Sequence, residues 1–150
     1  MIALEALRKS DLFGGLSDDE LLAVARIARE ETCEAGTQIF AENEVARTVY
    51  VVREGRVAIL VGVGLERQAV MSVVTKGGSF GWSALVAPYI RATTAKAVEK
   101  SRVVTIASEA LHELRQGKCC AYYTVIERVA ALAFNRLKET RLQLINLMYN

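Results

Sequence analysis

The segment from Gly77 to Arg91 contains the residue types best suited to binding a ligand. Its glycines come first and lead into residues 82–85, which suit a single helical turn and include the small residues Ser83 and Ala84. Such a turn presents free backbone N–H groups to an anion. Arg91 closes the segment, where its guanidinium can donate two parallel hydrogen bonds to a phosphate. The segment therefore predicts an anion-binding site.

Residues suited to acid–base or metal chemistry are scarce. His112 is the single histidine, so neither a histidine-based metal cluster nor a hydrolase triad can be assembled. Cys33, Cys119 and Cys120 are an odd number of cysteines, at spacings that fit neither a disulfide framework nor a metal site. For the adjacent pair, packing as small hydrophobic side chains is preferred over a redox function. We therefore expect a binding protein that is not an enzyme and holds no metal or cofactor.

Composition predicts one globular domain. The sequence has 150 residues, of which 52% are apolar, and this suffices for a packed core. A net charge of +2 is too low for binding nucleic acid through phosphate neutralisation. The longest uncharged apolar run, 57–65, is far shorter than the ~20 residues that span a bilayer, and the N-terminus lacks a signal-peptide pattern. With an odd number of cysteines, these features predict a cytoplasmic protein without membrane insertion.

Hydrophobic periodicity predicts a helix followed by a β-roll. Ser17 and Glu20 have the spacing of a capping box, before a helix from about Asp18 to Glu30. Many short strands separated by turn residues then indicate an antiparallel, jelly-roll-like fold. The strands are expected at residues 38–40, 48–52, 57–63, 69–74, 94–99 and 102–107. One domain is expected over 1–150, with a helical segment at 1–35, a roll at 36–107 containing the anion-binding segment at 78–91, and helices at 108–150.

Two helices are predicted at the C-terminal end, a short one from Ser108 to Gly117 and a long one from about Cys119 to Tyr149. The long helix carries a stripe with the alternating three- and four-residue steps of a coiled-coil seam, interrupted by Thr140, and this predicts a homodimer. The seam residues are Ile126, Ala130, Ala133, Leu137, Leu144 and Leu147. A second stripe can pack on the roll: Tyr122, Val125, Val129 and Leu132. The alternative is that both stripes pack on the helix's own domain.

The anion-binding segment resembles the phosphate-binding cassette of the cyclic nucleotide-binding domain family, to which protein kinase A regulatory subunits, catabolite activator protein and nucleotide-gated channels belong. The similarity extends over nearly the whole sequence. Residues 36–40 and 42–44 are similar to the family's first strand and turn, and residues 49–57 are similar to its central hairpin. The resemblance implies a double-stranded β-helix, jelly-roll-like roll that is mainly β with flanking helices, and a regulatory, non-enzymatic function.

Position by position, the resemblance implies roles for the cassette residues. Gly81 allows close approach of the ligand, the backbone of Ser83 and Ala84 donates to a cyclic phosphate, and Arg91 pairs with that phosphate. Ala92 stands where cyclic-GMP-selective members often have threonine, so cyclic AMP is expected to be favoured over cyclic GMP. The implied ligand-binding residues are Phe80, Gly81, Trp82, Ser83, Ala84, Leu85, Arg91, Ala92 and Thr93. The implied lid residues on the long helix are Tyr122, Tyr123 and Ile126.

Trp82 departs from the family pattern. Ligand-binding members have a glutamate here that accepts a hydrogen bond from the ribose 2′-hydroxyl, and an indole offers no acceptor. The loss corresponds to ~1 to 3 kcal/mol, or roughly five- to 150-fold in affinity.

This departure leaves two hypotheses. In the first, the ring packs beside a cyclic nucleotide or related anionic ligand, and the domain signals through its C-terminal helix. In the second, the ring fills the pocket, and the domain is a dimerising scaffold that binds no ligand. Because the sequence ends at Asn150 without a helix-turn-helix pattern, we expect no direct DNA binding and an effector on another chain.

Overall fold

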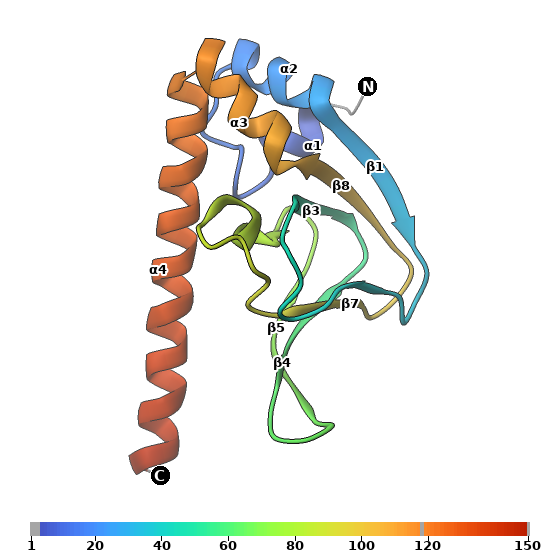
Figure 1. The fold of residues 1–150 in the computed structure, drawn as a ribbon, viewed down its shortest axis with the longest axis vertical. Coiled ribbons are helices and arrows are strands. Elements are labelled where there is room, and N and C mark those ends of the chain that lie inside the picture. The colour runs from blue at the N-terminus through green and yellow to red at the C-terminus, as the bar shows by residue number, and fades with distance from the viewer. Residues whose placement is uncertain (1–3, 118, 150) are drawn as a thin grey trace.

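The computed structural model describes residues 4–117 and 119–149 (Figure 1). Three short helices gather at one end of a β-roll, and one long helix runs along the side of the roll. The predicted anion-binding segment lies on the side of the roll that faces this long helix (Figure 1).

The N-terminal helices are α1, Leu4–Arg8, and α2, Asp18–Ile27. The predicted capping box is confirmed, because the Glu20 N–H donates to Ser17 Oγ at 3.3 Å and the Ser17 N–H donates to Glu20 Oε1 at 2.8 Å. The N–H groups of Ser17 and Glu20, which have no partner within the helix, are thereby hydrogen-bonded.

The predicted end of this helix at Glu30 is wrong. The backbone becomes extended at Ala28, and β1, Ala28–Cys33, pairs antiparallel with β8, Ser101–Ala107. Pairing across the sheet overrides local helix propensity here, since β1 pairs with residues 101–106 of β8. The segment 1–35 therefore contains a strand as well as helices.

The roll consists of two four-stranded sheets with the strand orders β1-β8-β3-β6 and β2-β7-β4-β5. The remaining strands are β2 Gln38–Phe40, β3 Thr48–Glu54, β4 Val57–Gly62, β5 Gln68–Val74, β6 Ser79–Phe80 and β7 Thr94–Ala97. All pairings between these strands are antiparallel. The predicted mainly β, jelly-roll-like fold with flanking helices is confirmed.

Alternation along β3 separates two hydrophobic cores, because successive side chains point to opposite faces of a sheet. Val49 and Val51 face the helices and join a cluster with side chains from α1, α2, α3 and α4. Tyr50 and Val52 face the interior of the roll, where Tyr50 lies among phenylalanines. The sheet thus separates the helical layer from the interior of the roll.

The C-terminal helices are α3, Ser108–Gly117, and α4, Cys119–Tyr149. The second stripe of α4 packs on the domain as predicted, with Val125 and Val129 almost fully buried. Beyond Leu132 the helix leaves the helical core. Leu137, Leu144 and Leu147 of the seam are then 54%, 55% and 82% exposed. The far half of α4 therefore presents an apolar stripe that its own chain does not cover.

Candidate ligand-binding pocket

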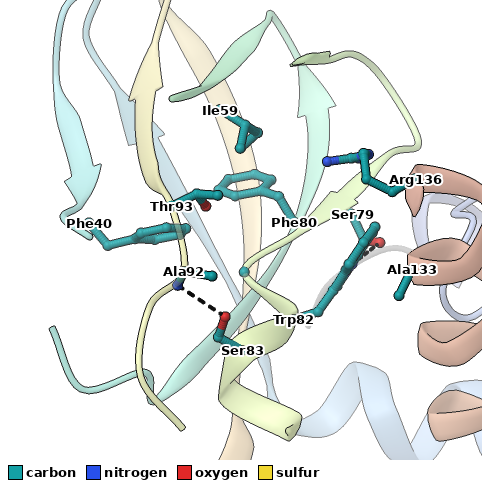
Figure 2. A pocket seen from close by; sticks show the side chains of 11 residues that line it. Phe40, Ile59, Ser79, Phe80, Trp82, Ser83, Ala92, Thr93, Ala133 and Arg136 are labelled. Carbon is teal, nitrogen blue, oxygen red and sulfur yellow. Dashed lines mark hydrogen bonds between the residues drawn. The ribbon is translucent and has the colours of Figure 1, made fainter. Parts of the chain in front are cut away.

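A cavity of about 260 Å³ lies between the cassette side of the roll and α4 (Figure 2). Its lining residues are Phe40, Ile59, Ser79, Phe80, Gly81, Trp82, Ser83, Ala92, Thr93, Ala133 and Arg136. Six of the predicted ligand-binding residues are therefore brought together on one surface: Phe80, Gly81, Trp82, Ser83, Ala92 and Thr93.

The cassette folds as a strand, a glycine and a short 3₁₀ helix. β6 ends at Phe80, Gly81 takes a left-handed φ of 80°, and the helix η1, Trp82–Leu85, follows. Adjacent residues of a 3₁₀ turn point in different directions. Trp82 and Ser83 consequently line the pocket, whereas Ala84 and Leu85 are buried in the helical core. The side chains of these last two anchor the cassette and do not line the cavity.

Arg91 lies behind the cassette, not on the pocket lining, and is only 4% exposed. Its Nη1 donates to the carbonyl oxygen of Gly81 at 2.9 Å, and its Nη2 donates to the carbonyl oxygen of Thr48 at 2.7 Å. Its Cζ lies 3.9 Å from the ring centroid of Phe40. Burial lowers the pKa of Arg91, which is opposed by the charges of Tyr50 and Glu44. The guanidinium therefore ties the cassette to β3.

Arg91 keeps donors for a further partner. A guanidinium carries five N–H donors, and its Nε has no hydrogen-bond partner among the described residues. A Cβ placed on Gly81 would lie 2.9 Å from Nη1, so the absence of a side chain at Gly81 is what lets the guanidinium approach. An anion bound at the Gly81 backbone would thus have a buried cation directly behind it.

Three aromatic rings form the interior wall beside the pocket. Tyr50 and Phe80 are stacked, with ring centroids 4.8 Å apart and an interplanar angle of 8°. Phe40 lies 6.1 Å from Phe80, and both phenylalanines reach the pocket. Burial raises the pKa of Tyr50, and the charge of Arg91 opposes this rise. These three rings form an apolar wall, and Arg91 packs against the face of the Phe40 ring.

Trp82 forms a wall of the pocket and leaves the cavity open. Its Nε1–H donates to Ser79 Oγ at 2.8 Å, which fixes the plane of the indole (Figure 2). Arg136 of α4 lies over the ring, with Cζ 5.2 Å from its centroid. The ring also packs partly against the helical core. Trp82 is thus a rigid contact between the cassette and α4.

The predicted lid residues lie away from the pocket. Tyr122 neighbours His112 at a ring distance of 5.5 Å, Tyr123 is 67% exposed, and Ile126 packs on the helical core. The α4 residues that line the pocket are Ala133 and Arg136. Ala133 follows Ile126 by about 10 Å along the helix axis, so α4 passes the pocket two turns later than predicted.

Five lining residues were not among the predicted ligand-binding residues: Phe40, Ile59, Ser79, Ala133 and Arg136. Arg136 lies three residues after Ala133 and so shares a helix face with it, but Ala133 was itself predicted as a seam residue, so the sequence placed neither residue at the pocket. Ser79 carried a weak signal, as a hydroxyl at the start of the cassette. For Phe40 and Ile59 the sequence offered only the pattern of a strand.

Two absences among the described residues bear on other functions. No group of three or more His, Cys, Asp or Glu side chains in 4–117 and 119–149 is placed to hold a metal ion. Within the same residues, no helix is long and apolar enough to cross a membrane.

The fold and the pocket define a β-roll domain with a flanking C-terminal helix and a glycine-led segment that lines a pocket. Residues 30–118 match the family model described as "Cyclic nucleotide-binding domain". The chain belongs to the cyclic nucleotide-binding domain family. The domains of this family are regulatory domains.

Solved structures of the same family are similar to the chain. A protein of Geobacter metallireducens GS-15, assigned to the cyclic nucleotide-binding proteins, is 31% identical with a TM-score of 0.79, and the match covers 91% of this chain and 99% of that one. The catabolite activator protein of Thermus thermophilus is 26% identical with a TM-score of 0.77, covering 93% and 63%. The regulatory domain of Toxoplasma gondii PKA, solved with cAMP, is 25% identical with a TM-score of 0.68, covering 73% and 42%. A search of curated proteins found no match.

Proposed function

We propose that this chain is a non-enzymatic regulatory module that binds a cyclic nucleotide in the pocket and signals through α4. The observation that carries the proposal is that the cassette and α4 line one cavity, the helix contributing Ala133 and Arg136. A ligand in this cavity contacts both elements, so its affinity depends on where α4 lies. By linkage, the ligand then shifts the position of the helix.

Charge at the pocket supports an anionic ligand. Arg136 is the charged side chain on the lining, none of the described lining residues is a carboxylate, and Arg91 lies directly behind Gly81. The cyclic phosphate is proposed to lie at Gly81 and Ser83, at the start of η1, where the first N–H groups of a helix lack partners within the helix. The Ala84 N–H, also predicted as a donor, already donates to the Gly81 carbonyl oxygen at 3.2 Å. The similar Toxoplasma gondii PKA regulatory domain holds cAMP, which favours a ligand of this class.

Adenine is proposed to be favoured over guanine. Ala92 and Thr93 both line the pocket. Ala92 stands where the family resemblance associates threonine with cyclic GMP, and its methyl side chain offers no hydroxyl to guanine. Cyclic AMP is therefore the preferred ligand in this proposal.

The output of the module is proposed to involve a homodimer. The exposed seam residues Leu137, Leu144 and Leu147 are seven and three residues apart, a heptad spacing with Thr140 at the intervening seam position. Two other predicted seam residues, Ile126 and Ala133, instead face the helical core and the pocket of the same chain. The module is proposed to act in the cytoplasm, to contact an effector protein and, with a net charge of only +2, not to bind DNA directly. The same exposed stripe favours a second candidate function, a dimerising scaffold whose pocket binds no ligand.

Titration calorimetry with cyclic AMP and cyclic GMP tests the proposal. Trp82 is the only tryptophan and lines the pocket, so its emission reports on occupancy in the same samples. Binding of cyclic AMP with a change in emission and slower hydrogen exchange around residues 133–140 is expected. No heat and no change up to millimolar ligand, in a protein that still dimerises, would instead support the scaffold.

A matched pair of variants links the binding to the pocket. Ala133→Leu adds a side chain to the cavity and is expected to weaken binding of cyclic AMP. Ala131→Leu makes the same change at an exposed position of α4 that does not line the cavity, and it should bind normally. Equal affinities for the two variants would place the ligand elsewhere.

A further inference from the structure

Arg136 is a pocket-lining cation without a counter-charge. Its guanidinium is half-buried and lies over the Trp82 ring. Among residues 4–117 and 119–149, no carboxylate forms an ion pair with it, although Glu139 follows one turn later on the same helix. Such a charge at the edge of an apolar cavity favours an anionic partner.

The side chains around Arg136 at this end of the pocket offer donors. The indole N–H of Trp82 is already donated to Ser79 Oγ, so the Ser79 hydroxyl has used an acceptor site and keeps its proton to donate. The guanidinium of Arg136 has no acceptor atom at all. A ligand hydroxyl that needs an acceptor finds only the second lone pair of Ser79 Oγ among these side chains, whereas an acidic group meets two donors.

The two anion-binding features lie at different parts of the pocket. Figure 2 shows Arg136 reaching in from α4 above the Trp82 ring, whereas Ser83 and Ala92 lie lower in the view, at the opposite end of the pocket. The Ser83 side has its own cation in Arg91, which is bonded to Gly81. One acidic group at the cassette therefore leaves Arg136 unpaired.

We propose that Trp82 and Arg136 are specificity-determining residues, and that a second phosphate group on a bound nucleotide raises its affinity because Arg136 binds that group. The inference rests on the proposed function, because it assumes that a nucleotide enters this pocket. Since Arg136 belongs to α4, the second phosphate also attaches the ligand directly to the signalling helix. A partly exposed ion pair of this kind corresponds to about a fivefold gain in affinity.

Calorimetry with adenosine 5′-monophosphate, adenosine 3′,5′-bisphosphate and cyclic AMP tests this preference. The bisphosphate is expected to bind at least about fivefold more tightly than the monophosphate. Arg136→Gln should bring that ratio to about one, because its amide carries no charge. Arg141→Gln removes the same charge from an exposed position of α4 that is not on the lining, so the ratio should persist.

The possible results distinguish a failure of this inference from a failure of the proposed function. Binding of cyclic AMP with a ratio of about one in the unaltered protein overturns the inference and leaves the proposed function standing. A ratio that falls equally in both variants also overturns it, since the effect is then one of net charge. No binding of any of the three probes overturns both. Thermal unfolding of each variant checks that the fold is retained.

Discussion

The guanidinium of Arg91 occupies the side of Gly81 on which a side chain would stand. A Cβ on Gly81 would meet Arg91 Nη1 at 2.9 Å and Tyr50 Cδ2 at 3.0 Å. Arg91 Nη1 also donates to the Gly81 carbonyl oxygen at 2.9 Å. The glycine that opens the cassette is therefore required by a buried arginine as well as by its left-handed backbone.

Replacing Gly81 with alanine is expected to destabilise the domain by about 2 to 4 kcal/mol. The left-handed φ of 80° contributes about 1 kcal/mol, and displacement of Arg91 from its carbonyl partners contributes the rest. Urea unfolding measures the loss. Gly36→Ala and Gly64→Ala are the controls, because both glycines have positive φ but nothing within 4 Å of a new Cβ. A cost at Gly81 no larger than at the controls would contradict the role given to Arg91.

Arg91→Glu is expected to unfold the domain or weaken it by roughly 3 to 5 kcal/mol, since a buried carboxylate would face two carbonyl oxygens. Arg91→Lys keeps the charge but cannot serve both carbonyls in the same geometry. It should fold with a smaller loss and bind cyclic AMP more weakly. Circular dichroism and calorimetry on the two variants separate the effects. A fully stable Arg91→Glu protein would show that the guanidinium does not hold the cassette.

Local patterns were sufficient for most of the fold. The capping box at Ser17 and Glu20 is set by residues three apart, and the bounds of α4 follow from a long helical period. β1 was missed because four of its six residues are polar or charged, so it carries no apolar alternation. Its strand conformation comes from pairing with β8, about 70 residues later in the chain.

The sequence predicts which segment forms the site, but not which side chains line the pocket. The sequence placed Gly81, Ser83 and Ala92 together because they lie close in the chain. It could not show that Arg91 turns inward to Thr48, since that contact joins residues 43 positions apart. It also could not fix which turn of α4 passes the pocket, because the packing of Val125 and Val129 on the helical core sets that position.

Trp82→Glu is expected to create selectivity for ribose. The carboxylate supplies the acceptor that the indole lacks, so cyclic AMP should bind roughly five- to 150-fold more tightly than 2′-deoxy cyclic AMP. The unaltered protein should bind the two nucleotides about equally. Competition calorimetry gives the ratio, and Trp82→Phe is the control that keeps a ring without an acceptor. A strong preference for cyclic AMP in the unaltered protein would mean that another group accepts from the 2′-hydroxyl.

Leu144→Glu is expected to dissociate the proposed dimer without unfolding the domain. Leu144 is 55% exposed in the single chain, so a carboxylate there keeps its hydration in the monomer. In a coiled-coil seam the change removes two buried leucines, one from each copy, at a cost of at least about 3 kcal/mol. Analytical ultracentrifugation measures the mass. Leu65→Glu, at a position 94% exposed in the β4–β5 turn, is the control and should leave the dimer intact. A monomeric unaltered protein would contradict the dimer.

The stability of the roll is expected to fall as the pH rises above about 9. Burial raises the pKa of the Cys33 thiol above its ordinary value of 9.0, with a further rise from the Glu31 charge, and burial also raises the pKa of Tyr50 above 10.0. Both groups are neutral when protonated, so their contribution is complete below the ordinary values and is lost as the pH rises through the raised ones. Urea unfolding from pH 8 to about 11 measures the decline. Cys33→Ala and Tyr50→Phe should each flatten it, whereas Tyr149→Phe, at a residue 80% exposed, should not. An equally steep decline in all three variants would locate the titrating groups outside the roll.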